Sequence, residues 1–203
     1  VAAGYRVYAP LPADPDERPL CCGRTFLAVG LVEEARREMQ RTLDALAPYV
    51  RRGIPVVGLE TSCLVTFRDE LPAMFTGEVV ELLAANARLF EEFIAHEHKQ
   101  GRLNLPLGPL PKKALLHGHC HQKAFDAMSA VESTLRLVPG LSVETIESSC
   151  CGMAGGFGYH PGTIEGSQKM GELSLLPPVR KVGAGTLVVS PGTSLRPPLF
   201  DGR

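Results

Sequence analysis

Apolar residues recur along the chain with two spacings, one typical of helices and one typical of buried strands. From Thr25 to Arg52 they return at steps of three and four residues, which predicts an amphipathic helix. The same spacing from Glu78 to His98 predicts a second long helix. Between them, residues 54–59 form a short β-branched run that predicts a buried strand.

The same alternation continues through the rest of the chain. Further strands are expected at residues 5–10, 113–117, 141–147 and 186–190, and further helices near residues 123–137 and 163–176. Strands that alternate with helices are typical of an α/β fold. We therefore expect a mostly parallel sheet with flanking helices.

One local pattern occurs twice. Each time Cys-Cys-Gly is followed by a helical pattern, an apolar strand and a Thr-Ser pair, first from Cys21 and again from Cys150. Such self-similarity is the mark of an internal repeat. The first copy ends in Thr-Ser-Cys at Cys63, whereas the second ends in Thr-Ser-Leu at Leu195. Leu195 therefore stands where the repeat predicts a cysteine.

The second copy has a front part that the first copy lacks. A strand, Cys120, a helix and another strand precede Cys150, but too few residues precede Cys21 for an equivalent. We expect two pseudo-repeated halves, with the first one N-terminally incomplete. The first half should cover residues 1–100, a Pro-rich connection residues 101–113, and the second half residues 114–203.

Composition narrows the classes of protein. The 203 residues are 44% hydrophobic and carry a net charge of −1, and no basic block suggests nucleic acid. No apolar run approaches the length of a membrane span, and no secretory signal is visible. A cytoplasmic protein is the expectation. Six cysteines in that setting are not expected to form three disulfides, and a bond between adjacent cysteines would strain the backbone.

The cysteines follow predicted strands. Cys63, Cys120, Cys150 and Cys151 come directly after the carboxyl ends of strands, which form the ligand-binding edge of a parallel sheet. The glycine after each adjacent pair would let the backbone approach a ligand closely. Clustered thiolates from separate loops suit a soft metal or an iron–sulfur cluster.

At these residues the chain resembles a known family. The motifs RPLCCGRTF, GLETSCLVTFRDELP, HGHCHQKA, ESSCCGMAGGFGY and KMGELSLLP resemble the cysteine-rich CCG domain of iron–sulfur electron-transfer proteins. The likeness is to the C-terminal part of fused FAD-linked 2-hydroxyacid dehydrogenases and to the iron–sulfur subunit of glycolate oxidase. It spans nearly the whole chain and departs from the family pattern at Leu195 and at the absent front part.

The resemblance implies a function and a set of ligands. It implies the electron-transfer part of an oxidoreductase, which passes electrons from flavin to an acceptor and does not bind the organic substrate. The implied cofactor is an iron–sulfur cluster, of the [4Fe–4S] type, with FAD on a separate domain or subunit. The implied partners are an FAD-containing dehydrogenase domain or subunit and an acceptor such as a quinone, with peripheral membrane association through a partner. The implied cluster ligands are Cys21, Cys22, Cys63, Cys120, Cys150 and Cys151.

Three histidines flank Cys120. His117, His119 and His121 would share one face if they lay on a strand, which would suit a ligand or a proton relay. For His117 and His121 we expect instead hydrogen bonds to carbonyls at a helix start. His119 stays open as a ligand, so the candidate metal set is Cys120, Cys150, Cys151 and His119.

Other interpretations compete with the cluster. Free cysteines also serve as core residues, Cys and His also bind zinc in structural or docking modules, and Leu195 allows a degenerate scaffold that binds no metal. The glycine-rich run after Cys151 does not have the GxGxxG spacing of a dinucleotide site. No catalytic residue can be assigned.

Overall fold

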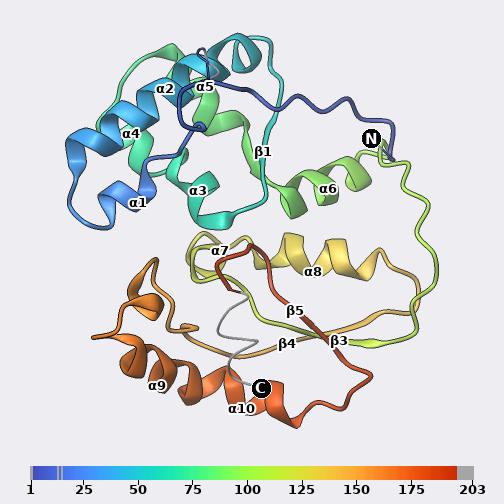
Figure 1. Cartoon of the computed structure of the whole chain (residues 1–203). Coiled ribbons are helices and arrows are strands. Elements are labelled where there is room, and N and C mark those ends of the chain that lie inside the picture. The colour runs from blue at the N-terminus through green and yellow to red at the C-terminus, as the bar shows by residue number, and fades with distance from the viewer. Residues whose placement is uncertain (1, 13, 15, 196–203) are drawn as a thin grey trace. The chain divides into compact units, whose positions relative to one another are not determined.

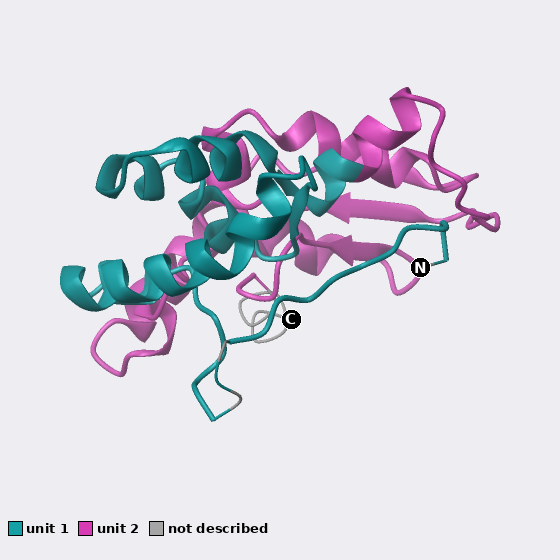
Figure 2. Cartoon of the chain, turned by 90° about the horizontal axis from the view of Figure 1, so that it is seen from above, with its two compact units in different colours: residues 1–93 teal, residues 94–203 magenta. Residues whose placement is uncertain are grey.

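The chain divides into two compact units. The computed structural model describes residues 2–12, 14 and 16–195 and separates residues 1–93 from residues 94–203 (Figures 1 and 2). Each unit combines helices with a parallel sheet. The α/β fold expected from the sequence is therefore confirmed. Residues 196–203 of the expected second half lie outside the described residues.

Unit 1 is mostly helical around a short parallel pair of strands. Strands β1 and β2 pair with Val56 opposite Ala87. Helices α2 and α5 pack against each other beside them. In chain order the elements are α1 (Arg24–Leu27), α2 (Val32–Val50), β1 (Val56–Gly58), α3 (Thr61–Thr66), α4 (Glu70–Met74), α5 (Glu78–Asn86), β2 (Ala87–Leu89) and the start of α6 (Phe90–Lys99).

The first long helix expected from the sequence is interrupted. It is split into α1 and α2, because Gly30 adopts a φ of 78° and Leu31 donates its N–H back to the carbonyl of Phe26. A glycine in this left-handed conformation is a common way to end a helix. The apolar spacing continues across the break, so periodicity alone did not reveal it.

The prediction of one long helix from Glu78 to His98 was also wrong in the middle of that range. Residues 87–89 form β2 between α5 and α6, and Ala87 and Leu89 are almost fully buried there. The guanidinium of Arg68 donates two hydrogen bonds to the carbonyl of Ala87, at 2.9 and 2.7 Å, and pairs with Glu92. The carboxylate of Glu92 also accepts the N–H of Leu89 at 2.8 Å. Contacts from a distant part of the chain therefore extend the backbone here.

The strand expected at residues 5–10 does not form. This segment has no strand partner among the described residues, and Val7 and Tyr8 are largely exposed. Its aromatic rings give it contacts instead: Tyr5 meets Phe93 edge-on, with ring centroids 5.2 Å apart, and Tyr8 lies 5.9 Å from the ring of Tyr49. Side-chain packing has replaced backbone pairing.

Unit 2 holds a three-stranded parallel sheet. The strand order is β4-β3-β5, with Leu115 of the central strand opposite Glu144 and Val188. Figure 1 shows α8 on one side of this sheet and α9 and α10 on the other. After the end of α6 the elements are β3 (Lys113–Leu116), α7 (Cys120–Ala124), α8 (Met128–Arg136), β4 (Ser142–Thr145), the 3-10 turn η1 (Phe157–Tyr159), α9 (Ile164–Ser174), α10 (Leu176–Lys181) and β5 (Leu187–Val189).

The strands expected in unit 2 are confirmed, and the helix expected near residues 163–176 forms as α9, which a separate helix α10 follows. The helix expected near residues 123–137 is interrupted between α7 and α8. Asp126, at a φ of 54°, lies between α7 and α8, and two prolines begin α10 directly after α9. Proline is tolerated in the first turn of a helix, where its missing N–H would have no partner in any case. The Pro-rich segment 102–112 contains neither helix nor strand.

The core of unit 2 reaches the cysteine-bearing loop. One apolar cluster joins the central strand to α10 and to the loop after β4. Its buried members are Leu115, Ile146, Cys151, Met153, Leu175, Leu176, Val179 and Leu195. Cys151 and Leu195 are thus parts of the same core.

No helix within the described part of the chain combines the length and the apolar character that crossing a membrane requires.

Candidate functional site

The two Cys-Cys-Gly turns share one local geometry. In unit 1 the Sγ of Cys21 accepts the backbone N–H of Gly23 at 3.4 Å, and in unit 2 the Sγ of Cys150 accepts that of Gly152 at 3.3 Å. In both turns the second cysteine is buried, with 7% exposure at Cys22 and 6% at Cys151. Backbone N–H groups directed at sulfur are typical of the surroundings of metal-bound cysteines.

The glycine of each turn is required by space and by backbone conformation. Gly23 has a φ of 80° and Gly152 a φ of 92°, a region that other residues rarely adopt. A Cβ on Gly23 would lie 2.7 Å from the carbonyl oxygen of Ala35, and one on Gly152 would lie 2.1 Å from that of Ser167. Each turn therefore packs its glycine directly against the following long helix. The same sequence motif builds the same turn twice.

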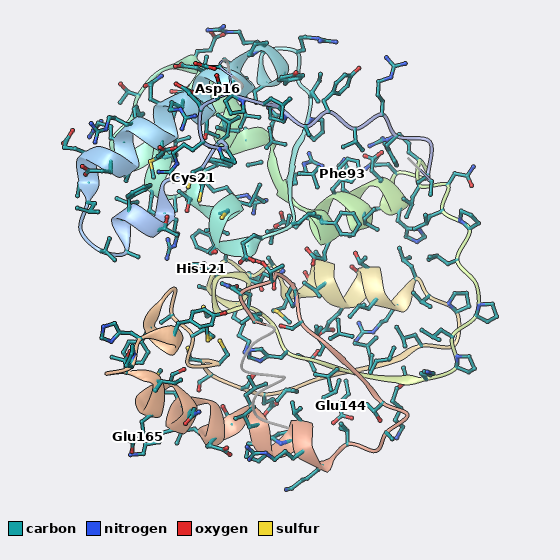
Figure 3. The ribbon with its side chains drawn as sticks, in the orientation of Figure 1. Asp16, Cys21, Phe93, His121, Glu144 and Glu165 are labelled. Carbon is teal, nitrogen blue, oxygen red and sulfur yellow. The ribbon has the colours of Figure 1, made fainter. Side chains whose placement is uncertain are left out.

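Unit 1 brings three cysteines together. Cys21 lies beside α2, where Thr42 donates its hydroxyl to the carbonyl of Cys21 at 2.7 Å (Figure 3). The thiol of Cys22 hydrogen-bonds to the sulfur of Cys63, and Cys21 also acts electrostatically on Cys63. The cysteines predicted in this half therefore form one group.

The two bonded thiols of unit 1 have opposite acid–base character. The hydrogen bond from Cys22 lowers the pKa of Cys63, against the opposing effects of burial and of Glu60. The same hydrogen bond, together with burial, raises the pKa of Cys22 far above its usual value. The contact between Cys22 and Cys63 therefore shifts their two pKa values in opposite directions.

The sequence predicted Cys63 directly after a strand, but the structure places it in a helix. Strand β1 ends at Gly58, and Cys63 lies in the first turn of α3, where its side chain is exposed. Glu60 precedes this helix and accepts the hydroxyl of Ser62 at 3.1 Å. The run after the strand turns at once into a helix that carries Cys63 to Cys22.

Unit 2 gathers its three cysteines at the carboxyl ends of two adjacent strands. Cys120 is the exposed first residue of α7, which follows β3, whereas Cys150 and Cys151 lie in the loop after β4. Burial raises the pKa of Cys151, and the neighbouring Cys150 and Cys120 act in the same direction. The three sulfurs thus lie within electrostatic reach of one another.

Leu195 and Cys151 lie in the same core of unit 2. Both side chains belong to the apolar cluster of unit 2, and Leu195 is only 2% exposed. In unit 1 the corresponding second cysteine, Cys22, bonds to Cys63. Whether Leu195 takes the place in unit 2 that Cys63 takes in unit 1 remains a prediction from the repeat.

The three histidines do not lie on one strand, because β3 ends at Leu116 and His121 lies in α7. His117 is buried at the end of β3, and its Nδ1 lies 2.7 Å from the hydroxyl of Ser148, not near the carbonyl that we expected. Burial, with smaller contributions from Lys123 and His119, lowers the pKa of His117 to about 4. His117 is therefore neutral at pH 7.

His119 serves as the N-cap of α7. Its Nδ1 accepts the backbone N–H of His121 at 3.1 Å and lies 3.8 Å from the Sγ of Cys120, while its own N–H donates to Gln122. The ring of His121 lies 5.1 Å away in the same turn (Figure 3). Because the helix start already uses Nδ1, a metal bond from His119 would have to come from Nε2.

The sequence interpretation missed Lys123 and Ser148. The ammonium of Lys123 donates to the carbonyl and to the hydroxyl of Ser148 and to the carbonyl of Ser149, at 2.5, 3.1 and 3.4 Å. The pKa of Lys123 is lowered by burial, and Cys120, Cys151 and Cys150 act against that shift. The available signal was a lysine one helical turn after Cys120.

The donor chemistry fits a soft metal group, although no complete metal site is formed. In the described residues, no three His, Cys, Asp or Glu side chains are placed to hold one metal ion. All six cysteines carry free thiols, and each unit collects three of them around an N–H···S turn. Thiolates with backbone hydrogen bonds are the ligand type of iron–sulfur clusters.

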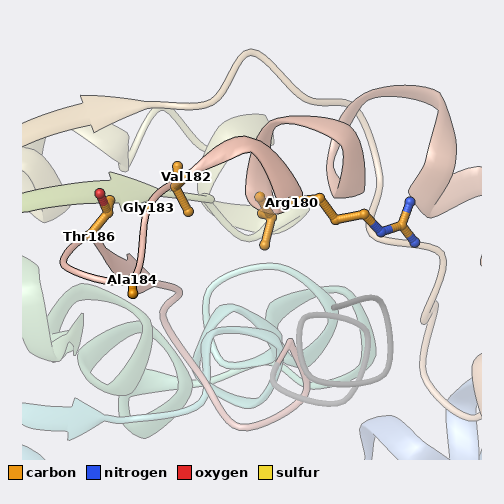
Figure 4. A pocket seen from close by; sticks show the side chains of 6 residues that line it. Arg180, Val182, Gly183, Ala184 and Thr186 are labelled. Carbon is orange, nitrogen blue, oxygen red and sulfur yellow. The ribbon is translucent and has the colours of Figure 1, made fainter.

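A shallow cavity lies elsewhere in unit 2. It measures about 260 Å³ and occupies the segment between α10 and β5 (Figure 4). Its lining residues are Val179, Arg180, Val182, Gly183, Ala184 and Thr186. It includes none of the residues that the sequence marks as functional.

Comparison with known proteins relates the chain to several oxidoreductase proteins. It is 30% identical over 152 residues to one subunit of the anaerobic glycerol-3-phosphate dehydrogenase of Escherichia coli K12, a match that spans 74% of this chain and 38% of that protein. It is 25% identical over 161 residues to D-2-hydroxyglutarate dehydrogenase of Pantoea ananatis, covering 79% of this chain and 15% of that enzyme. It is also 28% identical over 154 residues to lactate utilization protein A of Bacillus licheniformis, covering 71% of this chain and 60% of that protein.

These likenesses have a definite extent. The chain spans about two fifths of the glycerol-3-phosphate dehydrogenase protein and a smaller part of D-2-hydroxyglutarate dehydrogenase. No family model matches the chain, and no solved structure matches it. The relatives support a general association with dehydrogenases, which agrees at that level with the expectation from the cysteine motifs.

Proposed function

We propose that this chain is an iron–sulfur electron-transfer domain that serves an FAD-dependent 2-hydroxyacid dehydrogenase of the glycolate, D-lactate or D-2-hydroxyglutarate type. The observation that carries the proposal is the repeated Cys-Cys-Gly turn, in which a backbone N–H bonds to the first sulfur and a third cysteine joins the group. Relatives named for D-2-hydroxyglutarate and lactate support it.

The proposed ligands would form one group in each unit. Unit 1 would use Cys21, Cys22 and Cys63, and unit 2 would use Cys120, Cys150 and Cys151, with His119 as a further ligand through Nε2. A bound [4Fe–4S] cluster would supply one-electron chemistry. The protein's own part is to hold the thiolates, to direct N–H groups at sulfur and to control access of water, each of which tunes a cluster's potential.

The organic substrate would be oxidised elsewhere. A flavin-bearing domain or subunit would take the electrons from the hydroxyacid, and this domain would relay them to an acceptor such as a quinone. The Escherichia coli relative is named for glycerol-3-phosphate, which is not a 2-hydroxyacid. A common electron-transfer domain combined with different flavin partners would account for that difference.

Metal analysis of anaerobically purified protein tests the proposal. We expect iron and acid-labile sulfide in comparable amounts, a brown colour, and a marked loss of both elements in Cys151→Ser. Ser133→Ala, an exposed change on α8 of the same unit, is the control and should keep the wild-type content. Zinc without iron would show a zinc-stabilised module instead, and neither metal after reconstitution would show a scaffold.

A further inference from the structure

Lys123 connects α7 to the loop that carries Cys150 and Cys151. Its ammonium donates to both carbonyl oxygens that immediately precede Cys150, those of Ser148 and Ser149. It also reaches the hydroxyl of Ser148 at 3.1 Å. A long, rotamer-rich side chain is held here by three oxygens of one short segment, which is an ordering that a merely solvated lysine would not show.

The same segment is held from two other directions. The hydroxyl of Ser148 lies 2.7 Å from Nδ1 of His117, and the backbone N–H of Ser149 donates to the hydroxyl of Ser174 at 3.1 Å. The end of β3, the helix α7 and the helix α9 therefore all bond to the two residues before Cys150. Lys123 brings an ammonium group to this network.

The charge of Lys123 acts on the cysteines of the same unit. Cys120, Cys150 and Cys151 each favour the charged form of Lys123. The interaction is reciprocal, so the ammonium favours negative charge on the sulfurs. In unit 1, by contrast, the negative charge of Glu60 acts on Cys63 and raises the pKa of that thiol. The two cysteine groups thus differ in local charge.

We propose that Lys123 is a positioning residue for the cysteine site of unit 2, where it anchors the Ser148–Ser149 segment and raises the reduction potential of the group bound there. The second part rests on the proposed iron–sulfur function. Reduction adds negative charge to a cluster, so a fixed cation nearby stabilises the reduced state. Loss of that cation lowers the potential.

The anchoring part can be tested without any metal. Amide hydrogen exchange is measured on the metal-free full chain for the wild type, Lys123→Met, Lys123→Arg and Lys113→Met. Hydrogen bonds from a charged donor are stronger than neutral ones, so Lys123→Met should speed exchange at Ser149 and Gly152 about tenfold or more. Lys123→Arg should restore most of the protection. Lys113→Met, which removes an equal charge from an exposed site at the start of β3, should leave it unchanged.

The electrostatic part is measured on the reconstituted protein by redox titration. Lys123→Met should titrate at a lower potential than the wild type, Lys123→Arg should return toward it, and Lys113→Met should not move. Unchanged exchange in Lys123→Met overturns the anchoring role, and an unchanged potential overturns the charge role. A wild type that binds no cluster overturns the proposed function and the charge role together, while the exchange result still decides the anchoring role.

Discussion

At the scale of single residues, glycine conformation decides whether each cysteine pair can form its turn. Gly152 combines a φ of 92° with a backbone contact that leaves no room for a Cβ. Gly155 lies three residues further along the same loop and has a φ of 67°, but the space around it is open. A side chain at Gly155 would meet backbone strain alone, whereas one at Gly152 would meet backbone strain and steric overlap.

Gly152→Ala should be much more harmful than Gly155→Ala. The left-handed conformation alone costs roughly 1–2 kcal/mol for a residue with a Cβ, and overlap with the carbonyl of Ser167 adds roughly 1–3 kcal/mol. Denaturant unfolding of both variants measures the difference. Equal losses of stability would show that the close approach of Gly152 to α9 is not maintained in solution.

His117 predicts a fall in stability on acidification. Its pKa is about 4 in the folded chain, against an ordinary value of 6.5, because the ring is buried. Between these values the unfolded chain binds a proton that the folded chain does not, so stability is intact above about pH 6.5 and falls as the pH drops toward 4. The full loss is about 3 kcal/mol.

The measurement is the free energy of unfolding against pH, with His117→Gln as the comparison. That variant cannot take up the proton, so its stability should change less between pH 6.5 and 4. Parallel curves for the two proteins would contradict the assignment of this fall to His117.

At the scale of secondary-structure elements, long-range polar contacts decide where the second long helix of unit 1 breaks. Arg68 lies between α3 and α4 and bonds to the carbonyl of Ala87 and to Glu92, on either side of Leu89. Its side chain is only 22% exposed. The guanidinium thus satisfies a carbonyl that an uninterrupted helix would have used itself.

Arg68→Met should weaken β2. Loss of a half-buried charged donor leaves the carbonyl of Ala87 and the carboxylate of Glu92 without this partner, at a cost of about 2 kcal/mol. Arg37→Met is the control, because Arg37 pairs with Glu34 at the surface and such pairs contribute less than about 1 kcal/mol. Thermal unfolding compares the variants. A loss at Arg68 no larger than at Arg37 would contradict this role.

At the scale of the whole molecule, the two units repeat one turn but differ in the residue that ends the sequence repeat, which is Cys63 in the first copy and Leu195 in the second. In unit 1 Cys63 contacts the buried Cys22, whereas in unit 2 Leu195 belongs to the same apolar cluster as Cys151. A superposition that places Leu195 over Cys63 remains a prediction, which an experimental structure of the chain would test. If it holds, the second site lacks a fourth thiolate, and clusters usually bind four.

Leu195→Cys should therefore raise the iron and sulfide content after anaerobic reconstitution. The thiol would add a ligand beside Cys151, although removing a buried leucine side chain lowers stability. Leu195→Ala removes a similar volume without adding a ligand and is the matched control. If Leu195→Cys binds no more iron than Leu195→Ala, this position is not the site of a missing ligand.

The sequence by itself determined the features that depend on short windows of residues. Strands β1, β3, β4 and β5 were predicted from apolar runs, and the repeated Cys-Cys-Gly motif with its following helix was visible in the sequence. A run of β-branched residues and a glycine with a positive φ express their preferences locally, so neither needs a distant partner. For the same reason the α/β class could be predicted, and so could a helix after each Cys-Cys-Gly motif.

Only the tertiary structure decided the features that join distant residues. Strand β2 depends on Arg68 and on its pairing with β1. The hydrogen bond between Cys22 and Cys63 depends on α3, which carries Cys63. The loop before Cys150 is held by Lys123. These contacts link residues far apart in the chain, and each is favourable only once the intervening elements have packed. Periodicity records which face of an element is apolar, but which polar group meets which across the fold follows from packing alone.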